Sequence, residues 1–95
     1  MQERSPRYST YAAVQLSYRG SVCDALAVDV GLGGVCLYGV GGLPVGLKVS
    51  VRHLGLDFAS QVAWSKDLFT GLQFLIPLQP GELQALRVVP AALAA

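Results

Sequence analysis

Glycine divides this chain into short segments of alternating polar and apolar side chains, and this pattern limits the fold more than any other feature. The 95 residues include 11 glycines. Between glycines, segments 11–18 and 47–53 alternate cleanly, with Val49 and Val51 on one face and Lys48 on the other. A period of two is typical of a strand that buries one face. The pattern therefore predicts short strands joined by tight turns.

Six strands are expected, at residues 11–18, 21–29, 34–38, 47–53, 56–64 and 68–76. A helix is predicted from Gln79–Pro80 through residue 89, because proline suits the first helical turn and Pro90 stops the helix. This order of elements predicts a mainly β fold: a six-stranded antiparallel β-barrel with a C-terminal helix.

The last two predicted strands supply most of the large candidate core residues. In segment 56–64 these are Leu56, Phe58, Val62 and Trp64, and a one-residue shift midway indicates a β-bulge. In segment 68–76 they are Leu72, Phe74 and Ile76.

The length is that of one domain, with no internal linker. We expect a flexible N-terminal arm at residues 1–10, a barrel with its helix at residues 11–90, and a frayed tail at residues 91–95. No apolar run reaches the roughly 18–20 residues that span a bilayer, so we expect no membrane insertion and a cytoplasmic protein. The 53% hydrophobic content suggests a surface for a protein partner or a homodimer.

Charge is distributed unevenly along the chain. The net charge is +1, yet Arg4, Arg7 and Arg19 are opposed in their region only by Glu3. A local positive patch on a nearly neutral protein fits a small anionic ligand better than a nucleic-acid polymer, which needs many phosphate contacts.

Residue types that support catalysis or metal binding are sparse. His53 is the single histidine, next to a predicted turn, and is interpreted as a surface residue at a strand end. Cys23 and Cys36 lack a CxxC spacing and are interpreted as small buried hydrophobes. We therefore expect no enzyme activity, no metal and no cofactor.

The strongest candidate site combines a glycine-rich connection with arginines. Asp29 ends a predicted strand and is followed by Gly31, Gly33 and Gly34. Taken alone, these glycines predict a turn with positive φ. Arg4 and Arg7 precede the first predicted strand. Because a guanidinium can bind guanine or phosphate in a bidentate manner, the combination points to a nucleotide ligand.

In this arrangement the chain resembles the PilZ domain family, the bacterial receptor module for cyclic di-GMP. The family pattern is RxxxR before the first strand, then D/N-x-S-x-x-G at the end of the second. The second motif reads Asp29-Val30-Gly31-Leu32-Gly33-Gly34 here, and Arg7 takes the place of the second arginine. Glu3 stands where the first arginine is expected, Arg4 lies one residue late, and Gly31 replaces the serine.

The resemblance implies that the domain binds cyclic di-GMP and relays it to a partner protein. The implied ligand-binding residues are Arg4, Arg7, Asp29, Gly31, Gly33 and Gly34. The alternative is a degenerate PilZ-like domain that binds no cyclic di-GMP and acts as an adaptor or dimer in motility or pilus machinery. If the motif is merely incomplete, Glu3→Arg and Gly31→Ser together are expected to raise the affinity.

Overall fold

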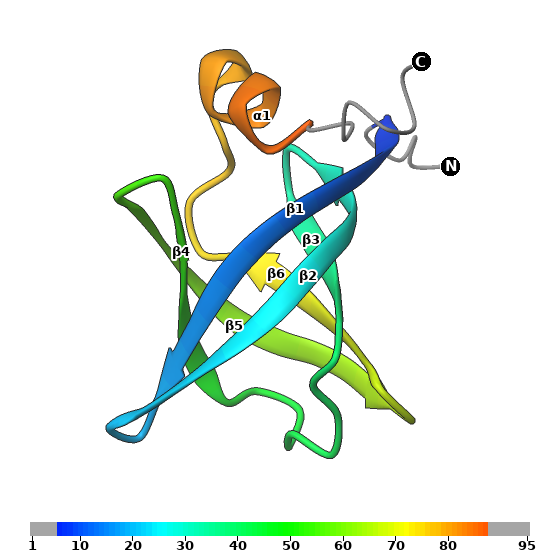
Figure 1. Cartoon of the computed structure of the whole chain (residues 1–95), viewed down its shortest axis with the longest axis vertical. Coiled ribbons are helices and arrows are strands. Elements are labelled where there is room, and N and C mark those ends of the chain that lie inside the picture. Colours follow the sequence, from blue (N-terminus) through cyan, green and yellow to red (C-terminus); the bar gives the residue numbers. More distant parts are fainter. Residues whose placement is uncertain (1–5, 88–95) are drawn as a thin grey trace.

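Six antiparallel strands close on themselves into a barrel in the computed structural model, which describes residues 6–87 (Figure 1). The strands are β1 (Arg7–Tyr18), β2 (Ser21–Gly31), β3 (Gly34–Tyr38), β4 (Lys48–His53), β5 (Leu56–Lys66) and β6 (Phe69–Phe74), followed by the helix α1 (Pro80–Leu86). Around the barrel they run in the order β1-β2-β3-β6-β5-β4. The predicted fold class is confirmed.

Several predicted boundaries are wrong. β1 begins at Arg7 rather than residue 11, so residues 7–10 belong to the sheet and not to an N-terminal arm. β5 continues to Lys66, which moves the following turn to residues 67–68. The helix ends at Leu86 with Arg87 as its C-cap, so the prediction that it runs through residue 89 is wrong. The tail at residues 91–95 and the arm before residue 6 lie outside the described residues.

The barrel interior is filled by one cluster of apolar side chains. Leu16, Leu37 and Leu86 are among the largest fully buried residues. The alternation predicted for β1 is confirmed, because Ala12, Val14 and Leu16 are all buried while their neighbours are exposed or half-buried. A sheet with one buried face requires this period of two.

Two predicted core residues of β5 are exposed instead. Leu56 is 44% and Trp64 46% exposed. The expected bulge is present, but it falls after Val62, which pairs with Leu72, and before Trp64, which pairs with Gly71. One extra residue in a strand turns the following side chains to the opposite face. Trp64 therefore points away from the core.

Ile76 is also exposed, at 77%, although it was predicted to be buried. β6 ends at Phe74, so the alternation that buries Leu72 and Phe74 no longer holds two residues later. The chain leaves the sheet there and runs toward α1 (Figure 1).

His53 is buried rather than on the surface, with 7% of its area exposed. Its Nδ1 lies 3.2 Å from the carbonyl oxygen of Ala13, and its Nε2 lies 3.1 Å from that of Ala85 in α1. β4 pairs with β1 only along Gln15–Ser17. Beyond that stretch, the two strands are joined by the His53 ring and the Ala13 carbonyl rather than by backbone pairing.

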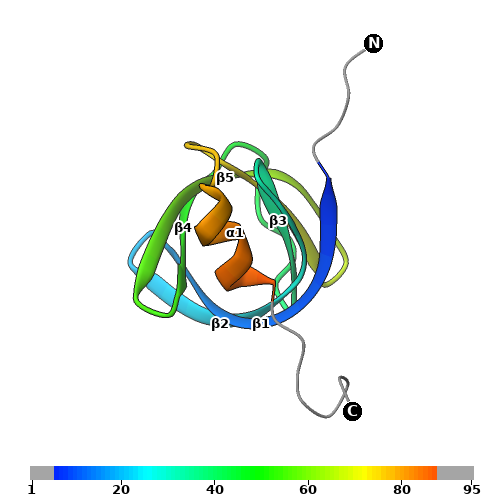
Figure 2. The ribbon, with the colours of Figure 1, turned by 90° about the horizontal axis from the view of Figure 1, so that it is seen from above.

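The helix α1 lies across one end of the barrel (Figure 2). It begins as the sequence predicted, with Pro80 in the first turn and the Gln79 N–H donating to the Glu82 carboxylate at 2.8 Å. A helix of seven residues is unstable alone. Among the described residues, no helix is long and apolar enough to cross a membrane.

The barrel satisfies the carbonyl groups that end this helix. The last four carbonyls of a helix lack partners within it. Here the backbone N–H of Arg87 donates to the carbonyls of Leu83 and Gln84. The His53 ring meets the Ala85 carbonyl, and the Thr10 hydroxyl donates to that of Leu86. Side chains from two strands therefore complete the C-terminal cap.

Replacing His53 should test this account of the helix end. We expect His53→Leu to lower the free energy of unfolding by about 1–3 kcal/mol, because two partly buried carbonyls lose a polar neighbour. Urea denaturation measures the change. The matched control is Arg52→Gln at the adjacent, exposed position, with an expected effect within about 0.5 kcal/mol. Equal stabilities of the two variants would contradict the cap.

Candidate ligand-binding site

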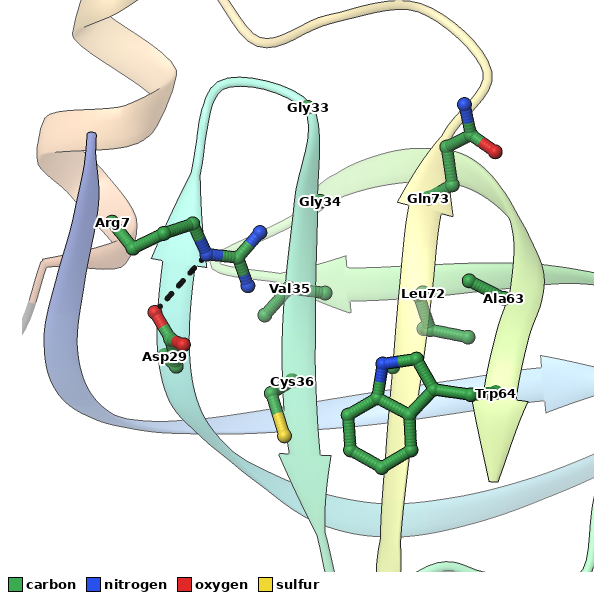
Figure 3. Close-up of a pocket in the computed structure, with 11 residues that line it drawn as sticks. Arg7, Asp29, Gly33, Gly34, Val35, Cys36, Ala63, Trp64, Leu72 and Gln73 are labelled. Carbon is green, nitrogen blue, oxygen red and sulfur yellow. Dashed lines mark hydrogen bonds and ion pairs between the residues drawn. The ribbon is translucent and has the colours of Figure 1, made fainter. Parts of the chain in front are cut away.

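A pocket of about 510 Å³ lies on the outer surface of the barrel, over β3 and β6 (Figure 3). Arg7 and Asp29 stand on one side and Trp64 on the other. The residues between them are small or apolar: Gly33, Gly34, Val35, Cys36, Ala63, Gly71 and Leu72, with Gln73 also lining the pocket. The structure thus brings four of the predicted site residues together, namely Arg7, Asp29, Gly33 and Gly34.

An ion pair sets the direction of the Arg7 side chain. The Nε of Arg7 donates to Oδ1 of Asp29 at 3.2 Å. Both side chains are about two-fifths exposed, at 41% and 44%, so the pair adds little to stability. Its main effect is geometric. With Nε occupied, the two terminal nitrogens of Arg7 extend toward β3 and the pocket (Figure 3).

Glycines let Arg7 lie this close to the sheet. A Cβ on Gly31 would stand 2.9 Å from the carbonyl oxygen of Pro6 and 3.0 Å from Cδ of Arg7. A Cβ on Gly34 would overlap the carbonyl oxygen of Leu72 and reach 3.6 Å from a terminal nitrogen of Arg7. Neither glycine has a positive φ, so the predicted turn conformation is wrong. Glycine is required at these two positions because neighbouring atoms lie where a Cβ would stand.

The contact at Gly31 bears on the expected effect of a serine at this position. A serine there was expected to complete the motif. Its Cβ would instead press on the backbone of Pro6 and the stem of Arg7. Gly31→Ser alone should therefore displace Arg7 rather than strengthen the site. Arg4 and Glu3 lie outside the described residues, so their roles stay predictions.

Trp64 and Gly71 also line the pocket and were not proposed as ligand-binding residues from the sequence. A Cβ on Gly71 would overlap the indole of Trp64, so the ring lies directly across this glycine. The sequence does place Trp64 in one predicted strand and Gly71 in the middle of the next, which pairs with it. Trp64 was missed as a pocket residue because the position of the bulge decides whether its side chain faces inward or outward.

Three register shifts surround the pocket. They lie between Ser9 and Ala12 in the β1–β2 pair, between Ala27 and Asp29 in the β2–β3 pair, and after Val62 in the β5–β6 pair. Bulges are common beside functional sites because they redirect side chains. Here the second and third shifts adjoin Asp29 and Trp64, and the first begins two residues after Arg7.

Cys36 is a half-buried free thiol in the pocket. It pairs across the sheet with Asp29 on one side and Gly71 on the other. Burial raises the pKa of this thiol, the Asp29 carboxylate raises it further, and the Arg7 guanidinium lowers it. Cys23 is likewise free and half-buried. In the described part of the chain, no cluster of His, Cys, Asp and Glu could hold a metal ion.

Alanine at the two neighbouring glycines should separate close packing from open space. Gly34→Ala is expected to lower the free energy of unfolding by about 1–3 kcal/mol, because the new methyl group meets the Leu72 carbonyl. Gly33→Ala is the control, since no atom lies within 4 Å of its Cβ position. Thermal and urea unfolding measure both variants. A neutral Gly34→Ala would show that this contact does not constrain the site.

The pH dependence of Cys36 alkylation should report the charges around the pocket. The thiolate is the reactive form, so a raised pKa shifts the rise in iodoacetamide reactivity to higher pH than for an exposed cysteine. In a Cys23→Ser background, Asp29→Asn should move that rise to lower pH, because a neighbouring negative charge is removed. A profile identical to that of the Cys23→Ser protein with Asp29 intact would contradict the assigned interaction between Asp29 and Cys36.

Comparison with known proteins supports the fold. No protein-family model matches the chain, and no curated protein matches its sequence. The structure is similar to that of the Bacillus subtilis inhibitor of motility, MotI/DgrA, with a TM-score of 0.65 and 18% identity. The match covers 92% of this chain and 49% of that one, so the chain spans about half its length. The likeness supports a PilZ-like barrel fold, as the sequence resemblance implied.

Proposed function

We propose that the pocket between Arg7 and Trp64 binds cyclic di-GMP and that the occupied domain signals to a partner protein. The observation that carries this proposal is the oriented arginine. Asp29 engages Nε of Arg7, and among residues 6–87 the terminal nitrogens of Arg7 have no hydrogen-bond partner above the glycines that line the pocket. An exposed indole stands on the opposite side.

The chemistry of the walls suits a purine ring joined to a phosphate. The free edge of a guanidinium can take O6 and N7 of guanine, or two phosphate oxygens, in a bidentate manner. An indole face supports base stacking, which contributes about 1–3 kcal/mol per base in nucleic-acid complexes. The glycines permit a flat ligand to approach the strand backbone closely.

The structural neighbour supports a regulatory role. MotI/DgrA is described as an inhibitor of motility, which is an action on another process rather than a conversion of substrate. Because this chain spans only about half of that protein, the likeness does not carry its action over, and control of motility by this chain is a proposal.

A second candidate function, a protein-interaction adaptor, rests on a different observation. Tyr38 and Phe69 pair across β3 and β6 with ring centroids 5.2 Å apart, and both are about two-fifths exposed, at 43% and 41%. Leu68, in the adjoining turn, is 54% exposed. Clustered exposed aromatic residues are typical of protein interfaces. An adaptor without a ligand predicts partner binding that cyclic di-GMP leaves unchanged.

Titration with cyclic di-GMP tests the proposed ligand. Trp64 is the only tryptophan, so its fluorescence should change as the pocket fills, and calorimetry should give the same Kd. Arg7→Ala is expected to weaken binding about 10- to 150-fold, the equivalent of a lost charged contact of about 1.5–3 kcal/mol. Arg52→Ala is the matched control, because Arg52 pairs with Asp57 outside the pocket.

Chemical protection gives an independent readout of the same site. A bound ligand should slow alkylation of Cys36, which lines the pocket, and leave Cys23 unaffected as an internal reference. Absence of heat, of a fluorescence change and of Cys36 protection at millimolar cyclic di-GMP would rule out the ligand and favour the adaptor.

A further inference from the structure

The first four residues of β1 present the proposed ligand arginine on one face and the contacts to α1 on the other. Arg7 and Ser9 are exposed on the outer face, whereas Tyr8 is half-buried and Thr10 buried. The alternation of side chains in a strand requires this division. A single strand end therefore lies between the pocket and the helix.

In the part of the chain that the structure describes, Thr10 and Tyr8 join the inner face of this strand end to the end of α1. The Thr10 hydroxyl donates to the carbonyl oxygen of Leu86 in a buried hydrogen bond. The guanidinium carbon of Arg87 lies 3.9 Å from the ring centroid of Tyr8, within the range of a cation–π contact. On the outer face, Arg7 is held by Asp29.

Within the described residues, the backbone of the start of β1 pairs with one neighbouring strand only. β4 pairs with β1 only along Gln15–Ser17, so the start of β1 has a strand neighbour on one side, β2. A register shift between Ser9 and Ala12 separates this end from the rest of the pairing. Strand ends with few partners open locally at low cost in free energy.

We propose that α1 positions Arg7. Tyr8, Thr10 and Arg87 are positioning residues that hold the start of β1 in its closed position, paired with β2 and in contact with the end of α1. The reciprocal effect follows by linkage, because an interaction at Arg7 and docking of the end of α1 favour the same closed strand. Occupation of the pocket therefore tightens the helix at the end of the barrel. The ligand half of this proposal rests on the proposed function, and the link between Arg7 and α1 does not.

The first experiment needs no ligand. In the free protein, Arg7→Gln removes the outer contact without touching α1, and hydrogen exchange at the Arg87 amide reports the last helical turn, since this N–H bonds to Leu83 and Gln84. We expect exchange about two- to fivefold faster, the factor that corresponds to an exposed ion pair of about 0.5–1 kcal/mol. Arg52→Gln, which removes an exposed ion pair on β4, is the control and should leave that amide unchanged.

The second experiment uses cyclic di-GMP and a matched pair at Tyr8. Tyr8→Phe keeps the ring beneath Arg87, whereas Tyr8→Leu removes it. Calorimetry should show a Kd about two- to fivefold higher for Tyr8→Leu, as expected for loss of a cation–π contact, and an unchanged Kd for Tyr8→Phe. In the wild type, saturating ligand should slow exchange at the Arg87 amide.

The outcomes separate the two proposals. If cyclic di-GMP does not bind the wild type but Arg7→Gln speeds exchange at Arg87, the proposed ligand is wrong and the coupling stands. If the ligand binds, equal Kd values for the two Tyr8 variants overturn the positioning role. An Arg87 amide that does not respond to Arg7→Gln overturns the coupling itself.

Discussion

Closure of the barrel depends on a short pairing between β1 and β4, and this pairing determines where the site can lie. Within the described residues, β1 pairs with β4 through its backbone only along Gln15–Ser17. The remainder of the strand extends past its neighbour, paired with β2 alone toward its N-terminal end. A strand with a free edge needs other contacts to hold it. Here Arg7 faces an acidic partner outside, and Thr10 meets the helix inside.

The same overhang explains why a seven-residue helix is stable here. α1 is too short to persist alone, and its terminal carbonyls need donors. His53 and Thr10 meet two of them from the barrel, and Leu86 is buried among the core side chains. The helix thus covers the barrel end and braces the strand from which Arg7 projects. Fold stability and site geometry share these contacts.

The sequence predicted more of the architecture than of the site. The six strands along the chain, the helix start and the inward faces of β1 and β4 follow from local periodicity and turn residues, which act within a few positions. The burial of three residues was predicted wrongly. Leu56 lies at a strand end, Trp64 follows a bulge, and His53 is covered by a helix from a distant part of the sequence. Arg7, Asp29, Gly33 and Gly34, which the sequence proposed as ligand-binding residues, line one pocket, but the sequence did not place the tryptophan opposite them.

The amino-acid sequence by itself determined that this chain forms short strands with one buried face, and that an aspartate is followed closely by clustered glycines, 22 residues after Arg7. Only the tertiary structure decided what those glycines do. They admit the Arg7 side chain against the sheet, and Gly71 admits the Trp64 indole, without any left-handed turn. Such contacts join residues from different strands, and the register of each pair fixes them. Since a shift of one residue reverses every side chain, pairing rather than composition places the pocket on the outside of the barrel.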